Sequence, residues 1–210
     1  EPVAFKIANG DLQKRGDEHW YKEELSDRSI KITARQSGDL LISSSYQLSS
    51  KASGQLPKGF KPSDHYNARF HPRGLQMALV GASDAIHSIG ISWEKISRKI
   101  MPDQVGVYAS SVYGQVDGES LGGLLQGRWR GERTTAKQSA LSLNSMPADF
   151  INAYILGSIG HSEAKTGACA SFLYTLQSAV KDIRSGRRRI AIVGNSEAPI
   201  TPEMSEGFSN

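Results

Sequence analysis

The chain has 210 residues, of which 38% are hydrophobic and 22% charged, so its composition supports a folded core and excludes an intrinsically disordered protein. Its one cysteine excludes an intrachain disulfide, no apolar run approaches membrane-spanning length, and Glu1–Lys6 carries no secretion-signal pattern. The formal net charge of +4 favours an acidic partner without identifying one. We therefore expect a soluble, cytoplasmic protein that binds neither membranes nor nucleic acid.

The first part of the chain, residues 1–53, gives weak signals. Residues 17–25 fit a short helix, and the alternation of Ile30–Thr33, followed by Asp39–Ser43 after a Ser-Gly turn, predicts a hairpin. Ser43–Gly54 is rich in serine and indicates a loop or an exposed edge. We assign residues 1–53 to an N-terminal segment and residues 54–210 to one domain.

Clear periodicity begins after His71. One helical face, with Pro72 in the first turn and an end near Gly90, is formed by Leu75, Ala78, Leu79, Ala82, Ala85, Ile86 and Ile89. His71 and His87 lie at the helix ends without an evident partner, so we interpret them as capping or solvated side chains. A short helical turn is expected at Trp93–Ile96, and Gln104–Ser110 predicts a buried strand.

The middle of the chain alternates helix and strand. The segment Gly114–Gly131 is rich in glycine but lacks the spacing of a phosphate-binding loop, so we interpret it as a mobile loop or helix over a site entrance. A helix is predicted over Met146–Gly157, with Ser145 as N-cap and Pro147 in its first turn. Strands are predicted at 158–165 and 189–193. This order is typical of an α/β fold with a parallel sheet.

Between these two strands lies the single cysteine, Cys169, where a helix is predicted to begin. The apolar stripe of that helix is formed by Leu173, Leu176, Ala179, Val180 and Ile183. Lys181, Arg184 and Gly186 mark its end. Small residues flank the sulfur, and a helix N-terminus favours a thiolate and a developing oxyanion. Its position alone is also compatible with another interpretation, in which Cys169 is a small buried hydrophobic residue.

The stretch Thr166–Ser171, the amphipathic helix after it and the strand Arg189–Glu197 together resemble the nucleophile region of β-ketoacyl-acyl-carrier-protein synthases, the condensing enzymes of the thiolase superfamily. The resemblance covers about residues 54–210. It implies a thiolase-like α/β fold, one half of a layered α-β-α-β-α sandwich, with Cys169 as the acylated nucleophile. It also implies an acyl carrier protein as partner and a homodimer that pairs the strand at 158–165. We predict neither a cofactor nor a metal.

In that family two catalytic histidines, a lysine and a glycine-rich loop of the oxyanion hole belong to the second half of the enzyme. The histidines of this chain, His19, His65, His71, His87 and His161, match none of the family's histidine motifs. We therefore expect the chain alone to accept an acyl group poorly and not to catalyse the condensation.

Two other classes of function remain open. One is a cysteine-dependent acyl hydrolase or acyltransferase of another α/β fold, and the other is a non-catalytic, ketosynthase-like dimerisation module. A carrier-docking face is predicted at Arg128, Arg130 and Arg133, with Lys61 and Arg69 as neighbours. Arg187–Arg189 form a second basic cluster, which we consider the poorer candidate because it follows the far end of the helix after Cys169.

Overall fold

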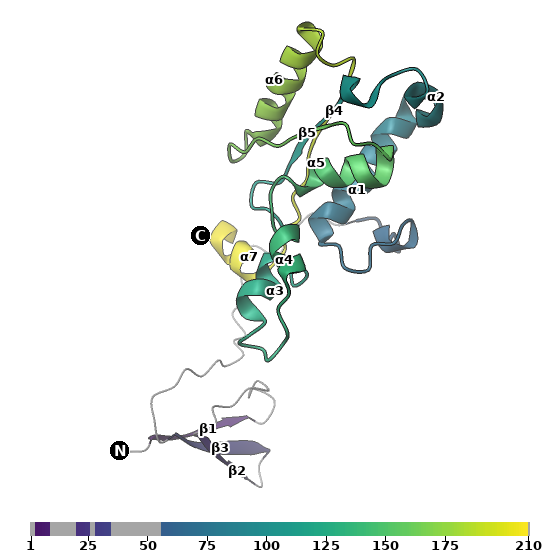
Figure 1. Ribbon diagram of the computed structural model, residues 1–210. Helices are drawn as coiled ribbons and strands as arrows, with labels where there is room; N and C mark the ends of the chain where they lie inside the picture. Colours follow the sequence, from purple (N-terminus) through teal and green to yellow (C-terminus); the bar gives the residue numbers. More distant parts are fainter. Residues whose placement is uncertain (1–2, 9–19, 26–27, 35–55, 210) are drawn as a thin grey trace.

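The computed structural model describes residues 3–8, 20–25, 28–34 and 56–209 (Figure 1). A small antiparallel sheet comes first, in the order β1-β3-β2. Its strands are β1 (Val3–Ala8), β2 (Trp20–Glu24) and β3 (Ser29–Ala34). Ile30 and Ile32 of the central strand are buried, and Phe5 and Trp20 pack against them. These aromatic and β-branched side chains give the small sheet its own hydrophobic cluster.

The predicted helix at residues 17–25 is wrong, because residues 20–24 form strand β2. Along its whole length β2 pairs with β3, with Trp20 opposite Ala34 and Glu24 opposite Ile30. Such pairing overrides a weak local preference for helix. The strand expected at Ile30–Thr33 is confirmed as part of β3, whereas its predicted hairpin partner at 39–43 lies outside the described residues.

The second sheet is parallel and has the order β5-β4-β6. Its strands are β4 (Val105–Ser110), β5 (His161–Glu163) and β6 (Ile190–Asn195). β5 is shorter than the strand predicted over 158–165. The α/β architecture expected from the sequence is confirmed, since strands and helices alternate along this part of the chain.

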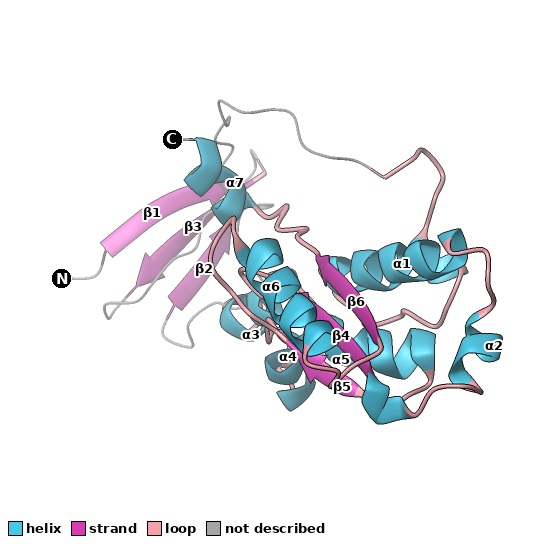
Figure 2. Ribbon diagram, turned by 90° about the horizontal axis from the view of Figure 1, so that it is seen from above, coloured by secondary structure: helices cyan, strands magenta, loops and turns pink. Residues whose placement is uncertain are grey.

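Helices cover both faces of the parallel sheet (Figures 1 and 2). One face carries α6 (Ser171–Arg184), which packs on β4 and β6. The other face carries α1 (Arg73–Ser88) and α5 (Met146–Phe150), and α5 continues into the π-helix η4 (Ile151–Leu156). The helices predicted near 75–90 and over 146–157 are thereby confirmed. Ser145 stands at the predicted N-cap, but its side chain makes no capping hydrogen bond.

The central strand β4 separates two different interiors. All six of its residues are buried, and because successive side chains point to opposite faces, Val105, Val107 and Ala109 face the α1/α5 layer. There they join Leu79, Ala82, Ile86, Ala148, Ile151 and Leu156 in one hydrophobic cluster. Gly106, Tyr108 and Ser110 alternate with them, and the Tyr108 hydroxyl reaches α6. The α1/α5 layer is therefore apolar, and the α6 layer is polar.

The predicted apolar stripe of α6 is mostly turned away from the sheet. Leu173, Leu176, Val180 and Ile183 are exposed in this chain, and of the stripe only Ala179 is buried. Its buried face consists instead of Ser171, Thr175, Ser178, Ala179 and Asp182. Periodicity located the helix correctly but could not say which of its two faces the sheet of this chain covers.

Shorter helices complete the fold. They are η2 (Pro62–Asp64), α2 (Trp93–Ser97), η3 (Pro102–Gln104), α3 (Leu121–Gln126), α4 (Ala136–Leu141) and α7 (Pro202–Ser209). α2 begins at the predicted turn, where Trp93 Nε1 donates to the carbonyl of Leu156 over 3.1 Å. In the part of the chain that the structure describes, we find no helix that combines the length and the hydropathy needed to cross a bilayer.

Candidate active site

Cys169 lies at the carboxyl edge of the parallel sheet, in the loop between β5 and α6. In open α/β sheets, ligands bind outside this edge. Ser110, the last residue of β4, joins three segments there. Its Oγ lies 2.9 Å from the carbonyl oxygen of Lys165 and 3.1 Å from Oδ1 of Asn195, and its own carbonyl accepts a bond from the backbone N–H of Ser196. The loop that carries Cys169 is thus attached to the ends of all three strands.

The residues around the sulfur form a tight turn, residues 166–170, which we call the Cys169 turn. Gly167 and Cys169 form an isolated bridge, and the N–H of Ala170 donates to the carbonyl of Gly167 over 3.0 Å. Ala168 has φ +47°, a left-handed conformation that costs a residue with a Cβ roughly 1–2 kcal/mol. Helix α6 begins two residues after the cysteine, at Ser171, and the thiol of Cys169 is exposed.

Tyr174 packs so closely on the Cys169 turn that Gly167 has no room for a side chain. A Cβ at Gly167 would lie 1.9 Å from the nearest carbon of the Tyr174 ring. The expectation of little bulk around the sulfur therefore holds for the small residues of the turn, while one exposed aromatic ring lies against it. Any larger residue at position 167 would have to displace that ring.

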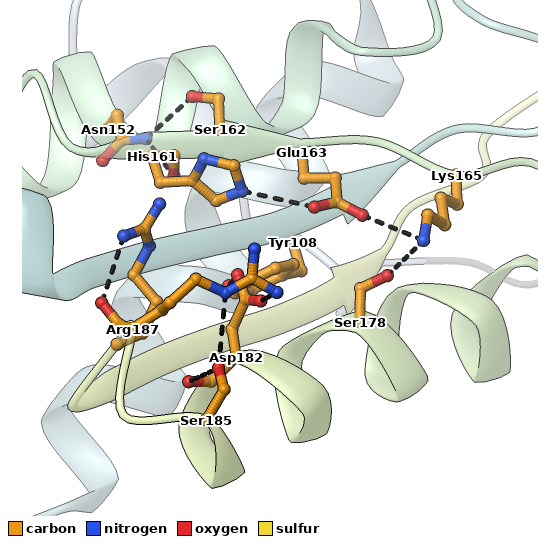
Figure 3. Close-up of polar contacts among 11 residues, drawn as sticks. Tyr108, Asn152, His161, Ser162, Glu163, Lys165, Ser178, Asp182, Ser185 and Arg187 are labelled. Atoms are coloured by element: carbon orange, nitrogen blue, oxygen red, sulfur yellow. Dashed lines mark hydrogen bonds and ion pairs between the residues drawn. The ribbon is translucent and has the colours of Figure 1, made fainter.

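Charged and polar side chains of β5, of α6 and of the loop between them form a network (Figure 3). Glu163 Oε1 pairs with Lys165 Nζ at 3.2 Å, its Oε2 lies 3.3 Å from Nε2 of His161, and the Lys165 ammonium also donates to the hydroxyl of Ser178. Burial raises the pKa of Glu163, but hydrogen bonds from Ser178, Lys165 and His161 outweigh burial and hold that pKa below its ordinary value. The carboxylate is therefore ionised at neutral pH.

A second carboxylate of the network is buried under α6. Asp182 Oδ2 accepts a hydrogen bond of 2.6 Å from Tyr108 of β4, and its Oδ1 pairs with Nη2 of Arg187 at 2.5 Å. The Tyr108 hydroxyl lowers the pKa of Asp182 most, and Arg187 and Arg188 lower it further against the effect of burial. Burial, followed by the bond to Asp182, raises the pKa of Tyr108. This contact holds α6 on the sheet.

The carboxylates and the imidazole bring metal-ligand atoms together. One such atom from each of His161, Glu163 and Asp182 lies within 4.8 Å of the others. However, Lys165 already neutralises Glu163, and Arg187 neutralises Asp182. A bound cation would have to compete with both, so we interpret the group as an ion-pair network.

We expect Tyr108→Phe to lower the free energy of unfolding at pH 7 by about 1–3 kcal/mol, because a buried carboxylate loses a charge-assisted hydrogen bond. The pKa of Asp182 is depressed in the folded state. The ionised carboxylate therefore stabilises the fold fully above the pKa of about 3.9 that aspartate has in the unfolded chain. This stabilisation is lost as the pH falls through the pKa of the folded state. Urea unfolding at pH 7 and pH 3 measures the free energy of unfolding of both proteins. The difference between wild type and Tyr108→Phe should be smaller at pH 3 than at pH 7. Asp182→Asn serves as the control, since the narrowing should disappear in that background; a gap independent of pH would contradict the assignment.

The histidine at the start of α1 differs from its predicted role. His71 is buried, and its Nδ1 and Nε2 each lie 3.3 Å from a tyrosine hydroxyl, of Tyr66 and Tyr154 respectively. Burial, and then Lys137, lowers the pKa of His71. It is a core histidine in an aromatic cluster, whereas His87 is exposed as expected and bonds within its own helix. Sequence periodicity gave no signal for these long-range contacts.

The arginines of the two basic clusters are placed differently. Arg128, Arg130 and Arg133 are exposed beyond α3, and Arg130 donates to Gln126, which in turn bonds Glu203 of α7. Arg187, by contrast, is engaged by Asp182, and Nε of Arg188 is buried. The second cluster thus helps to hold α6 through Arg187, whereas the first lies on an exposed segment beyond α3.

Comparison with known proteins places this geometry in a family. A family model described as the β-ketoacyl synthase N-terminal domain matches residues 19–210. The chain is 46% identical, over 209 residues, to the β-ketoacyl-[acyl-carrier-protein] synthase FabY of Pseudomonas aeruginosa, covering 100% of this chain and 33% of that protein. It is also 30% identical over 173 residues to the fatty acid synthase alpha subunit StcJ of Emericella nidulans, covering 74% of this chain and 10% of that protein.

The same relative appears among solved structures. The crystal structure of the noncanonical ketosynthase FabY from P. aeruginosa matches with a TM-score of 0.80 and 45% identity, over 100% of this chain and 33% of that one. The chain thus spans about a third of the length of FabY. The thiolase-like α/β fold predicted from the sequence is confirmed by this match. On the evidence of the family model and of the parallel sheet with Cys169 at its carboxyl edge, the chain belongs to the β-ketoacyl synthase N-terminal domain family.

Proposed function

We propose that this chain supplies the nucleophile of a β-ketoacyl-acyl-carrier-protein synthase and that Cys169 is that nucleophile. The observation that carries the proposal is the exposed thiol of Cys169 in a tight, anchored turn just before the N-terminus of α6. Backbone N–H groups at a helix start favour both a thiolate and the oxyanion of a tetrahedral intermediate. Family membership supports the same role.

The proposed reaction has two steps. The Cys169 thiolate attacks the carbonyl carbon of an acyl thioester, the carbon–sulfur bond to the carrier breaks, and the carrier leaves as its thiolate. A malonyl thioester then loses carbon dioxide, and the carbanion attacks the acyl carbon on Cys169, forming a carbon–carbon bond and releasing the thiolate. A covalent thioester divides one difficult substitution into two easier ones. One relative is named a β-ketoacyl-[acyl-carrier-protein] synthase and another a fatty acid synthase subunit, and both names support this substrate class.

A cysteine hydrolase of another fold is less well supported. Such an enzyme needs an imidazole within hydrogen-bond reach of the sulfur. Among the residues that the structure describes, no histidine is hydrogen-bonded to Cys169, and the one His–Glu pair, His161 with Glu163, is bound into the network with Lys165. We therefore retain condensation as the proposed activity.

The proposal is tested by looking for the acyl-enzyme. After incubation of the full-length protein with an acyl-loaded carrier, mass spectrometry should find the acyl mass on the peptide that contains Cys169. Hydroxylamine at neutral pH should remove it, as expected of a thioester. An unmodified Cys169 peptide, in a protein that still binds the carrier, would favour the non-catalytic dimerisation module.

For the carrier, we propose a docking face at Arg128, Arg130 and Arg133. Acyl carrier proteins are acidic, and these arginines are exposed on a segment that follows the carboxyl edge of β4. The other basic cluster follows α6, whose 14 residues span roughly 21 Å away from the cysteine. Arg187 in that cluster is also committed to Asp182.

We expect reversal of these three charges to glutamate to weaken carrier binding about tenfold or more and to flatten its dependence on salt. The matched control reverses Lys181, Arg184 and Arg189, which are exposed at the far end of α6 and should leave the affinity within about twofold. Binding is measured by isothermal titration at two salt concentrations. A larger loss in the control variant would move the docking face to that end of α6.

We further propose a homodimer paired through β5 and a cytoplasmic location. Within the described residues β5 pairs only with β4, so its other edge is available to a second copy. The single cysteine leaves no intrachain disulfide, which fits a reducing compartment.

A further inference from the structure

We infer that the hydroxyl group of Ser171 is a positioning group for Cys169: it holds the Cys169 turn in the conformation that presents the thiol. This inference rests on the proposed function, because it gives Ser171 a role in the reaction of Cys169. Ser171 acts on the cysteine indirectly, through the two residues that precede it.

The hydroxyl binds the Cys169 turn at two points. Ser171 Oγ accepts the backbone N–H of Gly167 over 2.8 Å and donates to the carbonyl of Ala168 over 2.7 Å. The N–H of Ser171 donates to the same carbonyl over 3.1 Å. Ser171 is fully buried, so these bonds are protected from competing water. One side chain at the start of α6 thereby binds the peptide group that precedes Gly167 and the peptide group that joins Ala168 to Cys169.

The conformation held in this way is one that an alanine disfavours. Ala168 has φ +47°, and it directly precedes Cys169. Relaxation of Ala168 to a negative φ would rotate the following peptide and change the direction in which the cysteine leaves the turn. The two bonds to Ser171 Oγ oppose that relaxation. Removing them should therefore populate turns in which the thiol points elsewhere.

Thr175 shows that a buried hydroxyl on α6 need not have this role. It lies one turn later on the same face and is equally buried, but its Oγ1 bonds only to helix carbonyls, of Phe172 at 2.8 Å and of Ser171 at 3.2 Å. The hydroxyl of Thr175 therefore contributes to the helix, and these bonds do not reach residues 166–170. Comparing substitutions of Ser171 and Thr175 therefore distinguishes an effect on the position of the thiol from an effect on the stability of α6.

The experiment compares Ser171→Ala with Thr175→Val in the full-length protein. The rate of Cys169 alkylation by iodoacetamide is measured across pH 6–9, together with the thermal midpoint and the rate of acyl transfer from a loaded carrier. We expect Ser171→Ala to change the alkylation profile and to slow acyl transfer by about tenfold or more. Each substitution removes one buried hydroxyl, so Thr175→Val should lower the thermal midpoint about as much as Ser171→Ala does. Thr175→Val should, however, leave the alkylation rate and the acyl-transfer rate within about twofold of wild type.

A suppressor makes the test specific. Glycine adopts positive φ without penalty, so Ala168→Gly in the Ser171→Ala background should restore most of the alkylation profile and of the acyl-transfer rate. If Ser171→Ala alone does not fold, recovery of a folded, reactive double variant supports the inference, and failure of the double variant overturns it. Equal effects of Ser171→Ala and Thr175→Val on the rates would also overturn it. Absence of acyl transfer in the wild type would refute the proposed function instead, while the alkylation comparison would still decide the role of Ser171.

Discussion

Replacing Cys169 with alanine is expected to abolish acyl transfer while leaving the fold intact. The side chain is exposed, so its loss should change the free energy of unfolding by no more than about 0.5 kcal/mol. Loss of a covalent nucleophile, by contrast, typically costs an enzyme a factor of about 10⁴ or more in rate. Condensation assays of the full-length protein with acyl and malonyl carriers measure the rate, and thermal melting reports the fold.

Cys169→Ser provides the matched variant. A hydroxyl has nearly the same size but is a far weaker nucleophile near neutral pH than a thiolate. We therefore expect Cys169→Ser to be nearly as inactive as Cys169→Ala and to carry no hydroxylamine-sensitive acyl group. Appreciable condensation by either variant, within about tenfold of wild type, would remove Cys169 from the mechanism.

Proline at position 162 is expected to convert the proposed homodimer into monomers or aggregates. Ser162 is the central residue of β5, opposite Val107 of β4, and β5 is an edge strand among the described residues. Proline has no N–H and is excluded from the middle of a sheet. If the free edge of β5 pairs with a second copy, the substitution should weaken association by at least about 100-fold, or roughly 3 kcal/mol. Light scattering after size-exclusion chromatography measures the change.

Ser162→Ala separates the backbone effect from the side chain. The Ser162 hydroxyl accepts a hydrogen bond of 2.9 Å from Nδ2 of Asn152, and alanine removes only that bond. We expect Ser162→Ala to remain a dimer with slightly lower stability. A Ser162→Pro protein that melts cooperatively and is still dimeric would place the interface elsewhere.

Much of the fold could be predicted because its elements carry strong periodic signals. The apolar face of α1 and the hydrophobic run of β4 are set by residues close together in the sequence. Gly186, with φ +75°, follows the end of α6, as predicted. The strand β2 was missed because its conformation depends on pairing with β3 rather than on its own residues.

The site was predictable only in its centre. Cys169 stands out as a single thiol between a strand and a helix, but Tyr108 and Asp182 are 74 residues apart, and nothing in the sequence indicates their contact. The same holds for the left-handed Ala168, because alanine ordinarily avoids that conformation and gives no signal for it. Ser171 resembled any small residue near a helix start until its two bonds to the turn were visible.

The alternation along β4 also gives the two helical layers different thermodynamic characters. Exposing the apolar α1/α5 layer to water would raise the heat capacity of the protein. Exposing the hydroxyls and the carboxylate of the α6 layer to water would lower it. Detachment of α6 from its polar layer would therefore appear in a calorimeter as a step with little heat-capacity change. Cold weakens the apolar layer first, and acid, by protonating Asp182, weakens the α6 layer first. The cysteine lies at the end of the layer that responds to acid.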